Sequence, residues 1–163
     1  MVSVKQFWSW MGQRAISATV VAVDGRNGPA GFLGLSATHV SADPPLISVS
    51  VSRSTSALAE ILARGRFAVS FLPEGGQDLV PIFGGSASVT GADRFRPGEW
   101  TTLTTGCPVH AQATGALDCM LEREIDLGHV LLLIGRVVDG AAREDSQPLI
   151  LFRGVMYRSG SVD

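Results

Sequence analysis

Hydroxyl and basic side chains gather at a turn near residue 53, between an expected strand and an expected helix. The run Ser52-Arg53-Ser54-Thr55 follows the alternating segment 46–51 and precedes the helix-forming segment 56–63. Serine hydroxyls, a guanidinium and the free N–H groups of a helix N-terminus can together bind phosphate without a P-loop. The same residues also suit an ordinary helix cap, with Ser54 or Thr55 as the capping residue and Arg53 solvated. Both interpretations stay open on this run alone.

A second candidate is the glycine-rich segment 31–41, which is followed by Asp43-Pro44-Pro45 and has the sequence GFLGLSATHVS. Its small residues and hydroxyls expose the backbone without bulk, which suits the binding of a flat ring with polar edges. Small residues in a strand equally suit close packing against neighbouring strands.

A third candidate is Gly128-His129, which enters the strand-forming segment 130–134. A histidine there can contact a cofactor phosphate or orient a nicotinamide, or it can be an ordinary strand-end histidine.

The elements that must position these residues are mostly strands. Runs rich in β-branched residues or alternating in polarity predict six or seven strands, and the rest of the chain predicts two or three short helices. The expected strands are 15–23, 35–40, 46–51, 67–72, 111–122, 130–138 and 149–152, with 156–157 as an extension; the expected helices are 56–63 and 79–83. Segment 84–108 predicts a loop with little regular structure. Strands that do not alternate with long helices favour an antiparallel barrel, closed or partly closed, with helices at its ends.

Composition limits the class of protein. A chain of 163 residues predicts one domain over 1–163, and 45% hydrophobic with 17% charged residues excludes intrinsic disorder. A net charge of −2 argues against nucleic-acid binding. Apolar runs far shorter than about 20 residues, and a first segment unlike a signal peptide, predict a soluble cytoplasmic protein without membrane spans. Two cysteines and three scattered histidines match no metal motif. Because the chain is apolar and carries few charges, we expect it to cover part of its surface by pairing with a second copy of itself.

Taken in order, these segments resemble the flavin reductase family, whose domain is an FMN-binding split barrel. The family pattern G-x-T-x-N-S-x-x-S-V-S-x-D-P-P-L aligns with residues 31–46, GFLGLSATHVSADPPL. Gly106-Cys107-Pro108 resembles the family's G-x-P. Residues 127–129 and 134–137, LGH and IGRV, resemble its G-D-H…I-G-x-V. The likeness covers about residues 15–157, and the order of the motifs carries it.

The resemblance implies a homodimer with one flavin per subunit near the interface. It implies an NAD(P)H:flavin oxidoreductase that reduces FMN, or FAD, by hydride transfer from NADH or NADPH and supplies reduced flavin to a partner monooxygenase. His129 would lie on the nicotinamide side. The cofactor-binding residues would be those that border the isoalloxazine (Leu35, Ser36, Ala37 and Thr38), those that face the phosphate (Ser52, Arg53 and Ser54) and those that close the pocket (Phe83 and Gly84).

Five positions depart from the family pattern. Its Thr and Asn fall on Leu33 and Leu35, its second Ser falls on His39, and the Gly and Asp of G-D-H fall on Leu127 and Gly128. These departures bear on the choice between FMN and FAD and on the use of a nicotinamide. The alternative functions are a flavin-binding split barrel that is not a reductase (oxidase-like, carrier or sensor) and a relative that binds haem.

Overall fold

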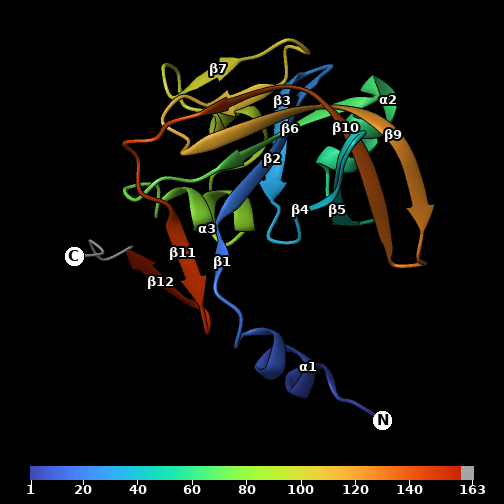
Figure 1. The fold of residues 1–163 in the computed structure, drawn as a ribbon, viewed down its shortest axis with the longest axis vertical. Coiled ribbons are helices and arrows are strands. Elements are labelled where there is room, and N and C mark those ends of the chain that lie inside the picture. The colour runs from blue at the N-terminus through green and yellow to red at the C-terminus, as the bar shows by residue number, and fades with distance from the viewer. Residues whose placement is uncertain (159–163) are drawn as a thin grey trace.

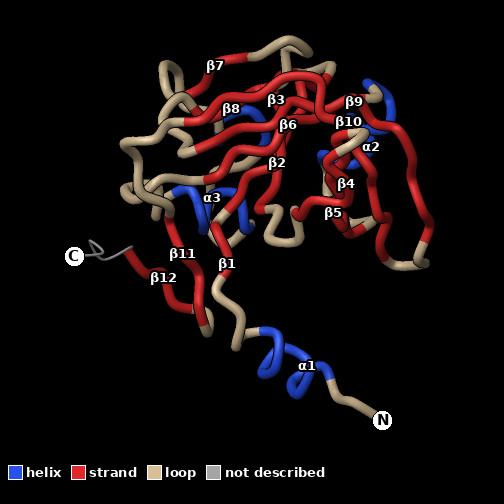
Figure 2. Tube along the Cα trace, in the orientation of Figure 1, coloured by secondary structure: helices blue, strands red, loops and turns tan. Residues whose placement is uncertain are grey.

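The computed structural model describes residues 1–158 of the chain. Within them, the helices are α1 (Val4–Met11), α2 (Ala57–Arg64), α3 (Leu79–Gly84) and the short 3-10 helix η1 (Gly91–Arg94). The strands are β1 (Ile16–Ser17), β2 (Thr19–Gly25), β3 (Gly28–Leu33), β4 (Thr38–Ala42), β5 (Pro45–Ser52), β6 (Arg66–Phe71), β7 (Trp100–Thr102), β8 (Pro108–His110), β9 (Gly115–Asp126), β10 (Val130–Ala142), β11 (Leu149–Phe152) and β12 (Val155–Arg158). Strands dominate the molecule (Figure 2).

Seven strands form one antiparallel sheet in the order β3-β2-β6-β9-β10-β5-β4 (Figure 1). The two edge strands, β3 and β4, are consecutive in the chain and are joined only by residues 34–37. Six strand spacings would place the edges of a flat sheet about 29 Å apart. The five residue steps from Leu33 to Thr38 span at most about 18 Å. The sheet must therefore curl until its edges meet without pairing, and the predicted split barrel is confirmed. We call residues 34–37 the seam connector.

The seam connector begins at a glycine because the backbone passes very close to a buried valine. A Cβ added to Gly34 would lie 2.4 Å from Cγ2 of Val21, on β2. Gly34 also exchanges hydrogen bonds with Thr19: its N–H donates to the Thr19 carbonyl at 2.8 Å, and the Thr19 hydroxyl donates to the Gly34 carbonyl. The connector thus starts from a rigid, buried point in the sheet, which sets the direction in which the following residues lie.

The barrel interior is the main hydrophobic core. Its fully buried side chains come from β2, β5, β6, β9 and β10 and from the inner face of α2, and include Val21, Val49, Ile61, Phe67 and Leu133. A smaller core packs α3 against β2, β11 and Ala18, which lies between β1 and β2, and contains Leu79, Phe83 and Leu149. Burial of such apolar surface is the dominant favourable term in folding. The two cores hold the sheet in its curled shape.

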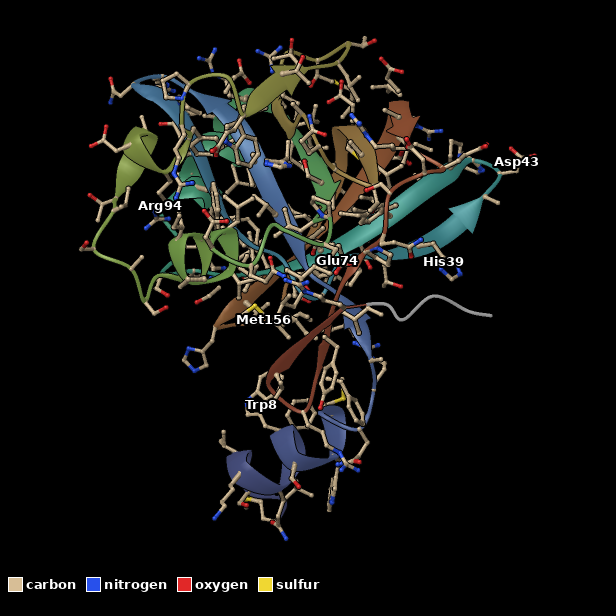
Figure 3. The ribbon with its side chains drawn as sticks, turned by 90° about the vertical axis from the view of Figure 1, so that its left-hand side faces the viewer. Trp8, His39, Asp43, Glu74, Arg94 and Met156 are labelled. Carbon is tan, nitrogen blue, oxygen red and sulfur yellow. The ribbon has the colours of Figure 1, made fainter. Side chains whose placement is uncertain are left out.

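The N-terminal helix α1 stands away from the barrel (Figure 1). Ser3 and Gln6 form a capping box at its start, but none of its residues is buried. Its aromatic side chains, Trp8 among them, are exposed beside the hairpin β11–β12 that carries Met156 (Figure 3). The helix is joined to that hairpin where the Arg153 N–H donates to the Gly12 carbonyl at 3.2 Å. Within residues 1–158, no helix is long and apolar enough to cross a membrane.

Several sequence predictions about individual elements need correction. The strand expected over 35–40 is a turn as far as Ala37, and β4 begins only at Thr38, because the chain there crosses from one sheet edge to the other. Segment 84–108 is mostly loop, as predicted, and the short elements η1 and β7 lie within it. The predicted number of strands, six or seven, is too low. The strands β1, β3, β7 and β8 were not predicted as separate strands, because they are short or lie next to another strand in the sequence. Helix α1 was not predicted.

Both cysteines lie in the barrel core, and we expect them to be inert in the native protein. Burial raises the pKa of the Cys119 thiol to about 12 and raises the pKa of the Cys107 thiol as well. The thiolate is the reactive form, and burial disfavours it at both positions. Iodoacetamide should leave both thiols unmodified in the folded chain and modify both in denaturant, as counted by mass spectrometry. Rapid modification of the folded chain would contradict this prediction.

Candidate functional site

The seam connector is anchored to β5 by Ser36. The Ser36 hydroxyl accepts a hydrogen bond from the Ser50 N–H at 2.9 Å and lies 3.2 Å from the Ser50 carbonyl, to which it donates. The turn is closed further by the Ala37 N–H, which donates to the Gly34 carbonyl at 3.0 Å. Residues 35–38 therefore form a short bridge across the seam, in which Ser36 and Thr38 are exposed and Leu35 is half-buried. Ser50 did not figure in the sequence predictions because its contribution comes from its backbone, which carries no sequence signal.

The β5–α2 turn lies at the end of the same strand. The Ser52 and Ser54 hydroxyls are 2.8 Å apart and share a hydrogen bond, and both side chains are exposed. The Ser54 N–H donates to the Ser52 hydroxyl at 3.3 Å. Helix α2 begins at Ala57, and its N-cap is Ser56, whose side chain makes no capping hydrogen bond. The expectation that Ser54 or Thr55 caps the helix is therefore wrong, and the hydroxyls of Ser52 and Ser54 face solvent together.

Arg53 is not free, because its side chain is bonded to the turn between β9 and β10. Its Nε donates to the Gly128 carbonyl at 2.6 Å, and its guanidinium forms an ion pair with the Asp126 carboxylate at 2.6 Å. The hydrogen bond from Arg53, with a second from the Gly128 N–H, lowers the pKa of Asp126. Asp126 did not figure in the sequence predictions. In the sequence, Asp126 is marked only as an acidic residue two positions before Gly128. That position does not indicate an ion pair with Arg53, which lies 73 positions earlier.

His129 is the last residue of this turn, immediately before β10. Its carbonyl accepts a hydrogen bond from the Arg53 N–H at 3.1 Å, and the next residue, Val130, pairs with Ser52 across the β10–β5 ladder. Among residues 1–158, the imidazole of His129 has no hydrogen-bond or ion-pair partner, and it is exposed. The fold thus brings three separate sequence candidates to one edge of the barrel: the seam connector, the β5–α2 turn and His129.

Two predicted residues are not joined to this group by any contact that the structure describes. Phe83 is 3% exposed and packs edge-on against Phe95, with ring centroids 5.1 Å apart, and against Trp100 at 5.4 Å. Gly84 is exposed, and a Cβ there would lie 3.6 Å from the Leu33 side chain at the end of β3. Their role in closing a pocket stays a prediction.

His39 lies on the outer strand of the sheet. It is exposed on the edge strand β4, where it pairs with Ile47 of β5, and Figure 3 places it at the margin of the molecule near Asp43. The histidine that replaces the serine of the family pattern is therefore exposed and directly follows Thr38, which the resemblance assigns to the isoalloxazine.

The candidate site is an open surface on the single chain. Two cavities of about 510 and 450 Å³ lie elsewhere, the first beside His110 and the β6–α3 loop and the second beside β7 and Pro97. Neither includes a residue of the seam connector or of the β5–α2 turn. Ser36, Thr38, Ser52, Ser54 and His129 are all exposed.

The chemistry of this surface fits a flavin nucleotide. The seam connector offers backbone polar groups and the Ser36 hydroxyl, which suit the polar edge of an isoalloxazine, and Leu35 is its one bulky side chain. The hydroxyl pair of Ser52 and Ser54, beside a helix start, offers the donors that a phosphate requires. The two groups are linked through β5, which carries Ser50 at one contact and Ser52 at the other.

Comparisons with known proteins agree with this geometry. The model of the flavin reductase like domain matches residues 11–160. An FMN reductase (NADH) RutF of Pseudomonas syringae is 32% identical over 93% of this chain and 84% of its own. The NADH:FAD oxidoreductase SgcE6 of Streptomyces globisporus superposes with a TM-score of 0.87 at 26% identity over 98% of this chain and 97% of its own. BorF, the flavin reductase component of a bacterial two-component tryptophan halogenase, gives a TM-score of 0.88 at 25% identity, covering 96% and 98%. Since the family model covers nearly the whole chain, this protein belongs to the flavin reductase like domain family.

Proposed function

We propose that this chain is a single-domain, cytoplasmic NADH:flavin oxidoreductase that reduces FMN. The observation that carries the proposal is the meeting of the seam connector, the Ser52–Ser54 hydroxyl pair and His129 at one edge of the barrel. It is supported by relatives about 30% identical that are named FMN reductases using NADH. FAD is a second candidate flavin, because SgcE6 is named for it. NADPH is a second candidate donor, since no residue pattern here selects against a 2′-phosphate.

When bound, the flavin supplies the redox chemistry and accepts reducing equivalents from the nicotinamide. The residues of this chain supply position. Residues 35–38 border the flat ring, largely through their backbone, and Ser52 and Ser54 hold the phosphate. His129 orients the nicotinamide from the β9–β10 turn. No side chain here is required as a general acid or base, so the protein contributes stacking distance, orientation and exclusion of water.

We also propose that two copies of the chain enclose each flavin between them. The site residues of one chain form an open surface, whereas cofactor sites usually bury most of their ligand. The exposed apolar side chains of α1 and β12, including Trp8, Trp10 and Met156, support burial of further surface in an assembly. Reduced flavin would then leave for a partner monooxygenase, as the names of the structural relatives suggest for those proteins.

The proposed activity is tested by anaerobic stopped-flow absorbance. Purified protein is mixed with FMN and then with NADH, and bleaching of the flavin band is followed against a protein-free control. We expect bleaching far above the control rate, and a repeat with NADPH and with FAD ranks the donors and flavins. Tight flavin binding without bleaching by either nicotinamide would instead identify a flavin-binding barrel that is not a reductase. Leu33 and Leu35 would then be the first residues to test as the cause of the missing activity.

A further inference from the structure

The turn that carries His129 is tied to the β5–α2 turn by one arginine and one aspartate. We infer that Arg53 and Asp126 act together as positioning residues, which hold His129 where the nicotinamide must lie. The inference rests on the proposed function, because it assigns the pair a task in nicotinamide use. It assigns Arg53 mainly to the β9–β10 turn, whereas the sequence predicted that it faces the phosphate.

Four contacts make this connection. Arg53 donates from Nε to the Gly128 carbonyl, from its guanidinium to Asp126, and from its backbone N–H to the His129 carbonyl. Asp126 in addition accepts from the Gly128 N–H at 2.8 Å. Asp126 therefore holds the turn from inside and attaches it to Arg53. We call this set of contacts the Arg53–Asp126 clamp.

The turn is otherwise held only by backbone contacts in the described part of the chain: the β9–β10 and β10–β5 ladders, and the Leu127 N–H, which donates to the Val130 carbonyl at 2.9 Å. Residues 122–129 are all exposed, so no buried side chain anchors the end of the β9–β10 hairpin. Segments with few buried apolar contacts open locally at low free-energy cost. Gly128 adopts a φ of +84°, a left-handed conformation that turns its carbonyl towards Arg53. Because the turn is so exposed, the position of His129 depends on the side-chain contacts that fix the backbone around it.

The clamp itself is exposed, which sets the kind of effect to expect. The side chains of Arg53 and Asp126 are 49% and 65% exposed. Exposed ion pairs add little to global stability. The consequence of breaking the clamp should therefore be found in the use of the nicotinamide and not in the melting temperature. Misplacement of a binding group by a small distance is enough to weaken productive binding severalfold or more.

The test compares Asp126→Asn, Asp126→Glu, Arg53→Ala and the double variant Arg53→Ala/Asp126→Asn. Three quantities are measured for each: flavin Kd by fluorescence titration without nicotinamide, KM for NADH, and kcat. We expect Asp126→Asn and Arg53→Ala each to raise KM for NADH by about tenfold, with kcat within about twofold and flavin Kd unchanged. The double variant should be no worse than either single variant, because both break one clamp. Asp126→Glu, which keeps the carboxylate, should recover part of the loss.

The control is Asp78→Asn, which breaks an ion pair of similar length and exposure that has no described bond to the seam connector, the β5–α2 turn or the β9–β10 turn. Asp78 and Arg96 are 2.7 Å apart and are 51% and 47% exposed. This variant should leave all three quantities at wild-type values. An unchanged KM in both clamp variants, with an active wild type, overturns the inference. So does a result in which Arg53→Ala raises flavin Kd tenfold and Asp126→Asn does not, since that returns Arg53 to the phosphate. A wild type that binds flavin but oxidises no nicotinamide refutes the proposed reductase itself.

Discussion

Replacing Phe67 with alanine is expected to lower the free energy of unfolding by about 3–5 kcal/mol. Phe67, on β6, is 0% exposed and lies at the centre of the barrel core. Its ring packs tightly under β10, where a Cβ added to Gly135 would lie 2.6 Å from the Phe67 Cζ. The alanine variant leaves a cavity that such a close-packed barrel cannot collapse to fill. Equilibrium denaturation followed by tryptophan fluorescence measures the loss.

The matched control for this prediction is Phe7→Ala. Phe7 lies on α1, is 47% exposed and belongs to neither core, so the same substitution should cost less than about 1 kcal/mol in the isolated chain. A loss below about 1 kcal/mol for Phe67→Ala would mean that the barrel interior is less closely packed than described. The position matters for function as well. Gly135 lies on β10, where the β9–β10 ladder shifts register between Ile134 and Gly135. The same strand begins directly after His129.

Substitution of alanine for Gly34 is expected to destabilise the fold by about 1–3 kcal/mol and to weaken flavin binding at the same time. The new methyl group would meet Cγ2 of Val21, a fully buried β-branched side chain that cannot move aside. The strain falls on the seam connector, which carries the residues assigned to the isoalloxazine. Thermal or chemical denaturation measures the first effect, and fluorescence titration with FMN measures the second.

Relief of the clash is the decisive check. In the double variant Gly34→Ala/Val21→Ala, the total loss of stability should be smaller than the sum of the two single losses, because the second substitution removes the clashing atom. Gly84→Ala is the control for stability: its Cβ would make only an ordinary contact at 3.6 Å, and it should change the free energy of unfolding by less than about 0.5 kcal/mol. Strict additivity of Gly34→Ala and Val21→Ala would show that the clash is absent.

The elements that the sequence predicted well are those whose pattern is local. The alternation of 46–51 is found as β5, the apolar face of 56–63 as α2, and 149–152 as β11, with the ends displaced by at most one residue. In each of these, the inward-facing side chains pack into one of the two cores, as Val49, Ile61 and Leu149 do. Helix α1 shows the converse. It has an apolar stripe through Val4, Phe7, Trp8 and Met11, yet the single chain buries none of it.

The sequence by itself therefore determined the mainly β class, the order of the motifs and the identities of the polar residues offered to a cofactor. Tertiary structure alone decided which of them meet. The seam connector passes directly from β3 to β4 because these strands are opposite edges of a sheet that curls until the edges lie close together, and within it Ser36 lies beside Ser50 in continuation of the β4–β5 register. Arg53 reaches Asp126 because β5 pairs with β10, across more than 70 residues. Short-range patterns record which face of a strand is buried, whereas strand order depends on the packing of the whole core, which no single segment encodes.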